Sequence, residues 1–266
     1  MYQVHPKPMR WPTMVDIIRN VCPRLTSLKI QQLPLQLRLD DSTTQDVFPT
    51  LTTLHLGDTC VTIKELIHLS LRFPNVESIR IRMKTSDCSL SSIDRSVVLP
   101  FKSVVFGAIT SDDLVAVLPK LPWMSRLLID QYDQQSSVAT LAEAFKRLGA
   151  RNQFKELQFP SRCLHRELLP DLTIFDGLDS SHVPLLRRIH IAFAAISGPL
   201  TPEMITTQII DRLAPSLRTL EVSLQGPDAI MTKPWAKTLE QWFEDRYENR
   251  TEDDLLETHL TRSLWS

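Results

Sequence analysis

Glycine is scarce in this sequence: the 266 residues include only six. Nucleotide-binding loops depend on glycine-rich turns that let the backbone approach phosphate groups, so a loop of this kind is not predicted. The sequence also contains no zinc-protease motif and no nucleophile elbow. We therefore expect that the protein is not an enzyme, with no catalytic residues and no cofactor.

The cysteines are few and scattered. They lie at positions 22, 60, 88 and 163 and include no Cys-x-x-Cys pair. This spacing predicts neither a zinc site nor a disulfide framework, so we expect no bound metal. Because a free cysteine packs as a small apolar side chain, we interpret Cys22 and Cys60 as core residues.

No sign of charge dominates, since 30 basic residues face 31 acidic ones. A balanced chain has no global charge to attract nucleic acid or an anionic membrane, and we expect neither as a partner. No stretch approaches the roughly 18 apolar residues that a membrane span needs, and the N-terminus lacks a signal-peptide pattern. We therefore expect a cytoplasmic or nuclear location.

A repeated unit stands out over residues 48–83. Phe48-Pro49-Thr50-Leu51 opens a short strand-like segment, and Phe73-Pro74-Asn75-Val76 opens a second one 25 residues later. In each copy the apolar residues occupy the first, fourth and sixth places of the segment, and the residues between the copies show helical periodicity. Repetition at this period indicates a solenoid, in which strand–helix units stack on one another.

The same pattern of apolar places occurs eight times. The copies are spaced by 23 to 32 residues, and proline precedes seven of the eight by one or two positions. Proline at this point ends the preceding helix without removing a central hydrogen-bond donor from the sheet. The first places of the eight copies are Leu25, Leu51, Val76, Phe101, Met124, Phe154, Leu186 and Leu217.

The repeats suggest three regions. Residues 1–13 contain three prolines and are interpreted as an irregular lead-in, and residues 14–226 as the repeat domain. Residues 227–266 are interpreted as helical, with one amphipathic helix over 234–247 and a second bearing Leu255, Leu256, Leu260 and Leu264. Two roles remain open for this last region: a cap that covers the open end of the core, or a tail that binds a partner.

The strand pattern Leu-x-x-Leu-x-Leu resembles that of leucine-rich repeats. Cys22-Pro23-Arg24-Leu25 and Cys60-Val61-Thr62-Ile63 resemble the cysteine-containing repeat type of F-box/leucine-rich-repeat proteins, and the unequal repeats look like fungal members. The residues Ala108-Ile109-Thr110-Ser111 resemble the same element after the strand. The resemblance covers about residues 14–224.

This resemblance implies an α/β fold of about eight repeats, with a curved parallel sheet on the concave face and helices on the convex face. It also implies a function, because such repeats hold substrates for a cullin–RING ubiquitin ligase. No F-box is recognisable among the 24 residues before Leu25. We therefore expect binding to a Skp-type adaptor only if an F-box lies upstream.

The strand pattern also predicts a binding surface. If the first, fourth and sixth places face the core, then the third, fifth and seventh face outward. Exposed apolar residues beside arginine are typical of interface hot spots, so we expect an unidentified protein partner on this face. The predicted partner-binding residues are Lys29, His55, Arg80, Arg82, Val105, Arg126, Leu128, Arg188 and His190.

Three interpretations of function remain open. The first is a protein-recognition module of the substrate-receptor type. The second is a leucine-rich-repeat regulator of an enzyme such as a small GTPase. The third is a truncated fragment without function.

Overall fold

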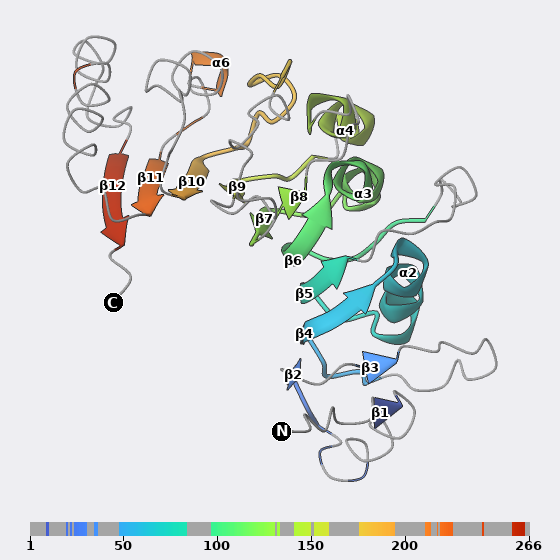
Figure 1. The fold of residues 1–266 in the computed structure, drawn as a ribbon. Helices are drawn as coiled ribbons and strands as arrows, with labels where there is room; N and C mark the ends of the chain where they lie inside the picture. The colour runs from blue at the N-terminus through green and yellow to red at the C-terminus, as the bar shows by residue number, and fades with distance from the viewer. Residues whose placement is uncertain are drawn as a thin grey trace.

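The fold was analysed in a computed structural model, shown in Figure 1. The structure describes residues 9–10, 20, 22, 24–30, 35–36, 48–83, 97–130, 132–133, 141–149, 152–159, 176–194, 211–213, 217, 219–225, 241 and 257–263.

The main feature of the fold is an open parallel sheet of ten strands, with the order β12-β11-β10-β9-β7-β6-β5-β4-β2 and with β8 paired to β6. The chain adds its strands to the sheet in sequence order, as expected for a chain of strand–helix units. A separate parallel pair is formed by β1 (Met9–Arg10) and β3 (Leu35–Gln36). The strands of the main sheet are β2 (Ser27–Ile30), β4 (Thr53–Val61), β5 (Ser78–Met83), β6 (Ser103–Thr110), β7 (Arg126–Ile129), β8 (Tyr132–Asp133), β9 (Glu156–Phe159), β10 (Arg188–Ala194), β11 (Thr219–Gln225) and β12 (Glu257–Ser263).

The helices whose bounds fall within the described residues are short and lie between strands. They are α2 (Ile63–Arg72), α3 (Ser111–Val117), the 3-10 helix η2 (Leu118–Lys120), α4 (Leu141–Leu148) and α6 (Asp211–Leu213). In Figure 1 the sheet is curved, and α2, α3 and α4 lie on the outer side of the curve. The prediction of an α/β fold with a parallel sheet is therefore confirmed, and each of the eight predicted strand segments is a strand of this one sheet.

The core lies on the helix-covered face of the sheet. Leu54 and Leu56 of β4 and Ile79 and Ile81 of β5 are fully buried, while the residues between them are half-buried or exposed. A strand with one buried face produces this alternation. The buried apolar residues form one cluster that extends from Phe48 to Leu217.

A regular backbone ladder fixes how the repeats align. The carbonyl oxygen of Thr26 accepts hydrogen bonds from the backbone amides of both Thr52 and Thr53. The carbonyl oxygen of Thr52 likewise accepts hydrogen bonds from the amides of Glu77 and Ser78. The same double acceptance recurs at the carbonyls of Glu77, Lys102, Ser125 and Lys155. Each repeat is thus tied to the next just before its strand begins, which holds equivalent residues side by side.

The interpretation of Cys22 and Cys60 as core residues is wrong. Both side chains are exposed, and both thiols are free. Strand β4 continues to Val61, and its register with β5 shifts between His55 and Cys60. Beyond the shift Thr59 and Val61 face the core, so the alternation of the strand turns Cys60 outward.

The predicted helix around Leu260 is also wrong, because residues 257–263 form β12. This strand pairs in parallel with β11 along its whole length, from Thr219 opposite Glu257 to Gln225 opposite Ser263. A free strand edge exposes a row of backbone donors and acceptors, and pairing with it outweighs the weak helical pattern of this segment. Gln241, within the predicted helix over 234–247, is helical. The other residues of the region 227–266 lie outside the described part of the chain.

Within the predicted lead-in of residues 1–13, the structure describes Met9 and Arg10. They form β1, because they pair with Leu35 and Gln36 of a segment that comes after β2. The other residues of the lead-in lie outside the described part of the chain.

Within the described residues, no helix has the length and apolar character needed to cross a membrane.

Candidate functional site

The predicted binding residues lie on the face of the sheet opposite the helices, which we call the inner face. Six of the nine occupy the fifth place of their strands. Backbone pairing places His55 between Lys29 and Arg80, and Val105 between Arg80 and Leu128. The row continues through Gln158 to His190 and Glu221. We call this the fifth-place row, and its alignment confirms the strand register predicted from the sequence.

Side chains in this row are accessible to a partner. Lys29 and Arg80 are exposed, whereas His55, Val105 and Leu128 are half-buried. Their neighbours along the strands, such as Leu54 and Leu127, are completely buried. The fifth-place row is therefore the surface of the sheet, and at Val105 and Leu128 that surface is apolar.

A second row of predicted residues runs beside the first, at the third place of the strands. Arg126 and Arg188 lie on either side of Glu156, and both arginines are exposed. The Nε atom of Arg126 lies 3.2 Å from Oε2 of Glu156. The carboxylate thus offsets part of the positive charge predicted here.

Arg80 is held by a longer bridge. Its Nη2 atom donates to Oδ2 of Asp130 at 2.5 Å, which joins β5 to the residue directly after β7. Strand β6 lies between β5 and β7 in the sheet, so this ion pair crosses over β6. An ion pair between half-exposed groups contributes only about 0–1 kcal/mol, so a partner carboxylate can compete with Asp130 for the guanidinium group.

Arg82 is the one predicted residue that departs from the regular rows. It pairs with Cys60 and Ala108 after the register shifts, and its side chain is half-buried. A Cβ atom added at Gly107 would lie 3.0 Å from Cγ of Arg82. The aliphatic stem of Arg82 therefore passes over Gly107, and glycine provides the space.

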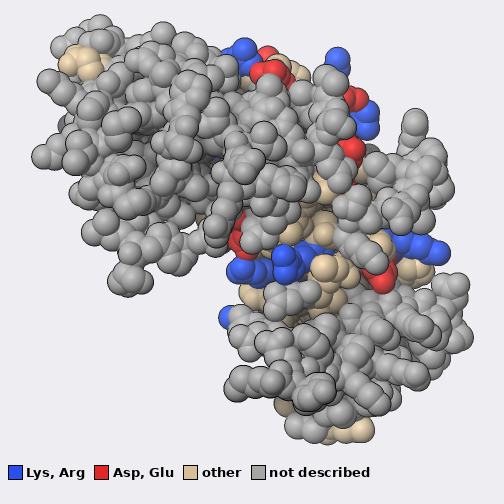
Figure 2. Space-filling view, viewed as in Figure 1, with Lys and Arg blue, Asp and Glu red and all other residues tan. Residues whose placement is uncertain are grey.

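The first strands carry the positive end of the inner face. Burial lowers the pKa of His55 below its ordinary value, and the neighbouring charges of Arg80 and then Lys29 lower it further. Protonation of His55 is disfavoured because burial penalises the charged ring and because it would place a third positive charge beside Arg80 and Lys29. Figure 2 shows basic side chains gathered in a band near the middle of the visible face, with acidic side chains close by.

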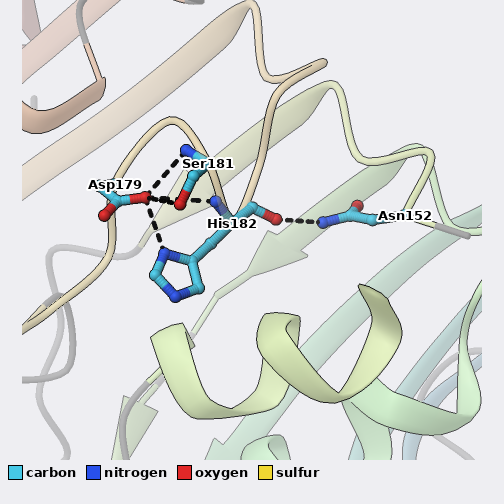
Figure 3. Close-up of polar contacts among 4 residues, drawn as sticks. All are labelled: Asn152, Asp179, Ser181 and His182. Carbon is cyan, nitrogen blue, oxygen red and sulfur yellow. Dashed lines mark hydrogen bonds and ion pairs between the residues drawn. The ribbon is translucent and has the colours of Figure 1, made fainter. Parts of the chain in front are cut away.

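A cluster of Asp179, Ser181 and His182 contains the residue types of a hydrolase triad, but its geometry is that of a turn. Oδ1 of Asp179 accepts hydrogen bonds from Ser181 Oγ at 2.5 Å and from the Ser181 amide at 2.8 Å, and it contacts Nδ1 of His182 at 2.8 Å (Figure 3). In a triad the histidine bridges the serine and the carboxylate. Here the carboxylate accepts from both, so His182 is not placed to act as a base for the Ser181 hydroxyl.

Asn152 attaches this turn to the preceding repeat. Its Nδ2 atom donates to the His182 carbonyl at 2.7 Å (Figure 3). Its Oδ1 atom accepts from the Phe154 amide at 2.9 Å. The side-chain amide of Asn152 is buried, and both its nitrogen and its oxygen have a hydrogen-bond partner. These two hydrogen bonds explain why a polar side chain is buried at this position. The cluster is structural.

No group of three or more histidine, cysteine, aspartate or glutamate side chains in the described part of the chain is placed to hold a metal ion.

A groove that the inner-face prediction did not include lies along the ends where the strands begin. Its lining includes Pro74, Pro100, Lys102, Trp123 and Lys155, and none of the nine predicted residues. Trp123 is 52% exposed. The sequence contains a signal for this exposed tryptophan. Trp123 directly precedes the first place of its repeat, and the same position in earlier repeats holds the polar residues Thr50 and Asn75.

A scan against protein-family models gives no match, and a search of curated proteins gives none either. The resemblance to leucine-rich repeats therefore depends on the residues of this chain alone.

Proposed function

We propose that this chain is a leucine-rich-repeat solenoid that binds another protein on the inner face of its sheet, in the manner of the substrate receptors of F-box/leucine-rich-repeat proteins. The observation that carries the proposal is the fifth-place row. It brings Val105 and Leu128, from adjacent strands, together as an apolar centre beside Arg80.

The chemistry of this centre suits protein recognition. Interfaces favour arginine and apolar side chains at their centres and lack lysine and glutamate there. Arg80 lies beside Val105 on the neighbouring strand β5, and Arg126 lies two residues before Leu128 on β7. Each arginine is oriented by an acidic neighbour, Asp130 or Glu156. Oriented guanidinium groups lose less side-chain freedom when a partner binds, which favours affinity.

The relation to substrate receptors is supported by the spacing of the repeats and by the turns that lead from strand to helix. Thr62 and Thr110 occupy equivalent positions at the starts of α2 and α3. Both lie in the segments after the strands that resemble the cysteine-containing repeat type. The strands present the inner face while the connecting helices occupy the other side, so a partner is recognised by strand residues. We assign the substrate-binding half of receptor function to this chain.

The test compares partner capture by three forms of the protein in cells. The first is wild type, the second carries Arg80→Ala and Leu128→Ala, and the third carries Lys64→Ala and Leu71→Ala on exposed positions of α2. We expect partners captured by the wild type and by the α2 control to be lost from the inner-face variant. With a purified partner, truncation of one hot-spot residue costs about 2 kcal/mol or more, equivalent to about 30-fold in Kd.

Leu128 is half-buried, so thermal unfolding of the double variant is measured in parallel to separate lost binding from lost folding. A partner whose affinity is unchanged by the folded inner-face variant would show that the proposed face is wrong.

A further inference from the structure

The groove at the beginning of the strands is long and runs across the repeats. It extends from Thr26, before β2, to Lys155, before β9. These two strands are five steps apart in the sheet order, and at about 4.8 Å for each step the groove is about 24 Å long. An extended peptide of about seven residues has this length, at about 3.3 Å per residue.

Trp123 is the dominant apolar side chain of the groove. It lies in the turn between η2 and β7, and its neighbours Leu121 and Met124 fill the core beneath it. At the same place in earlier repeats, Thr50 donates to the Leu25 carbonyl and Asn75 donates to the Pro49 carbonyl. Those side chains tie neighbouring turns together, whereas half of the Trp123 side chain faces solvent.

The second-place carbonyls of the groove are already occupied by the ladder between repeats. Each second-place carbonyl from Thr26 to Lys155 accepts two amides of the next repeat. A carbonyl oxygen has two lone pairs, so these carbonyls have no remaining capacity for the amides of an added strand. At these second-place positions a ligand is therefore recognised by side chains and not by an added backbone ladder.

The charged side chains along the groove are mainly basic. Lys102 pairs with Glu77 at 2.5 Å, and both side chains are more than half exposed. Lys155 is exposed two strands beyond Lys102, and Arg187 is exposed at the same place in the next repeat. The groove lining thus carries two basic side chains, Lys102 and Lys155, and one acidic side chain, Glu77, and Arg187 adds a basic side chain just beyond its end.

We propose that this groove is a second docking surface, which binds an acidic, extended segment of a partner protein and packs one large apolar residue of that segment against Trp123 and Pro100. The charge of the groove selects the acidic residues, and the exposed indole ring provides the apolar contact. Tryptophan is favoured at such anchor points because it buries a large area in a rigid side chain. This surface does not depend on the inner face, since none of the fifth-place residues lines it.

A selection from a display library of random seven-residue peptides tests the proposal with the 266-residue chain. We expect the enriched peptides to be acidic and to carry an aromatic, leucine or proline residue. Their affinity should fall about 10-fold or more with Trp123→Ala and with Lys155→Glu, and it should weaken with added salt because exposed charges are screened. Trp123→Phe should retain much of the affinity, since it keeps an aromatic ring at this place.

The Arg80→Ala and Leu128→Ala double variant is the matched control and should bind these peptides like the wild type. If enriched peptides depend on Arg80 and Leu128 but not on Trp123 or Lys155, the groove proposal is wrong while the inner-face proposal gains support. Enrichment of neutral or basic peptides, or no enrichment, also overturns the groove proposal. Because Lys155 is exposed, Lys155→Glu tests the groove even if Trp123→Ala reduces folding.

Discussion

Asp179 shows how one side chain can organise a turn. The side-chain hydrogen bond from Ser181 contributes most to lowering the pKa of Asp179 to about 2, and contacts with His182 and the Ser181 amide add to this effect. The carboxylate form is therefore favoured in the folded protein compared with the ordinary value of 3.8. The stabilisation is present above pH 3.8 and is lost as the pH falls toward 2.

We predict that Asp179→Asn reduces the loss of stability between about pH 4 and about pH 2. Asparagine retains an acceptor oxygen for the turn but cannot be protonated in this range, so its contribution no longer changes with pH. The measurement is the urea midpoint at a series of pH values. The effect is modest because the Asp179 side chain is 47% exposed and screened by solvent.

The control for this prediction is Asp176→Asn, which removes another exposed aspartate just before the turn. An NMR titration of the Asp179 carboxyl gives a direct check. A pKa near 3.8 in the folded protein would contradict the role assigned to the Ser181 and His182 contacts.

At the scale of single elements, the ends of the helices explain part of the sequence pattern. The side chain of Thr62 accepts the Glu65 amide at 3.2 Å, and Oε2 of Glu65 accepts the Thr62 amide at 2.8 Å. This reciprocal pair is a capping box, which satisfies backbone amides that the first turn of α2 leaves free. Thr110 accepts the Asp113 amide at the start of α3 in the same way.

We predict that Thr62→Ala lowers the free energy of unfolding by about 1 kcal/mol. In a double-mutant cycle with Glu65→Ala, the two losses should be less than additive, because either substitution alone breaks the reciprocal pair. Urea denaturation of the four proteins gives the coupling energy. Lys64→Ala, at an exposed position of the same helix, is the control and should change stability by less than about 0.5 kcal/mol.

Strictly additive losses in this cycle would mean that Thr62 and Glu65 act independently. The register shift in β4 belongs to the same scale. Local alternation predicted the outward residues up to His55, but the shift before Cys60 arises from pairing with β5 and left no signal in the sequence of β4 itself.

At the scale of the whole molecule, the buried apolar residues form one continuous cluster. It includes Leu54 of β4 and Leu157 of β9, both completely buried. Each repeat buries its apolar residues against the next, so no repeat between them has a core of its own. The described sheet should therefore unfold as a unit.

We predict that Leu54→Ala and Leu157→Ala each lower the free energy of unfolding by about 2–5 kcal/mol. Hydrogen exchange in denaturant should show the amides of β4 and β9 losing protection together in either variant. Leu71→Ala is the matched control, because Leu71 is 70% exposed, and it should have little effect.

If Leu54→Ala instead released β4 while β9 kept its wild-type protection, the two ends of the sheet would be separate folding units. A small loss of stability from Leu54→Ala would contradict the burial on which the inner face depends.

The sequence by itself determined which residues of each strand face the core and which face outward. That information is local, because the apolar places and the period of two lie within each segment, and proline marks where each segment begins. When equivalent segments pair in register, their fifth-place residues line up and form the predicted row from Lys29 to His190. The six fifth-place residues of the site were predictable for this reason.

Only the tertiary structure decided which groups those residues contact. Arg80 and Asp130 are 50 residues apart, and their ion pair depends on the sheet order that places β6 between them. The strand β12 forms because β11 offers an edge, and its own residues did not predict it. The exposure of Trp123 depends likewise on how neighbouring turns align at the start of the strands. Contacts of this kind depend on which segments become neighbours in the fold. The residues of a single segment do not specify those neighbours, so these contacts could not be predicted from the segment alone.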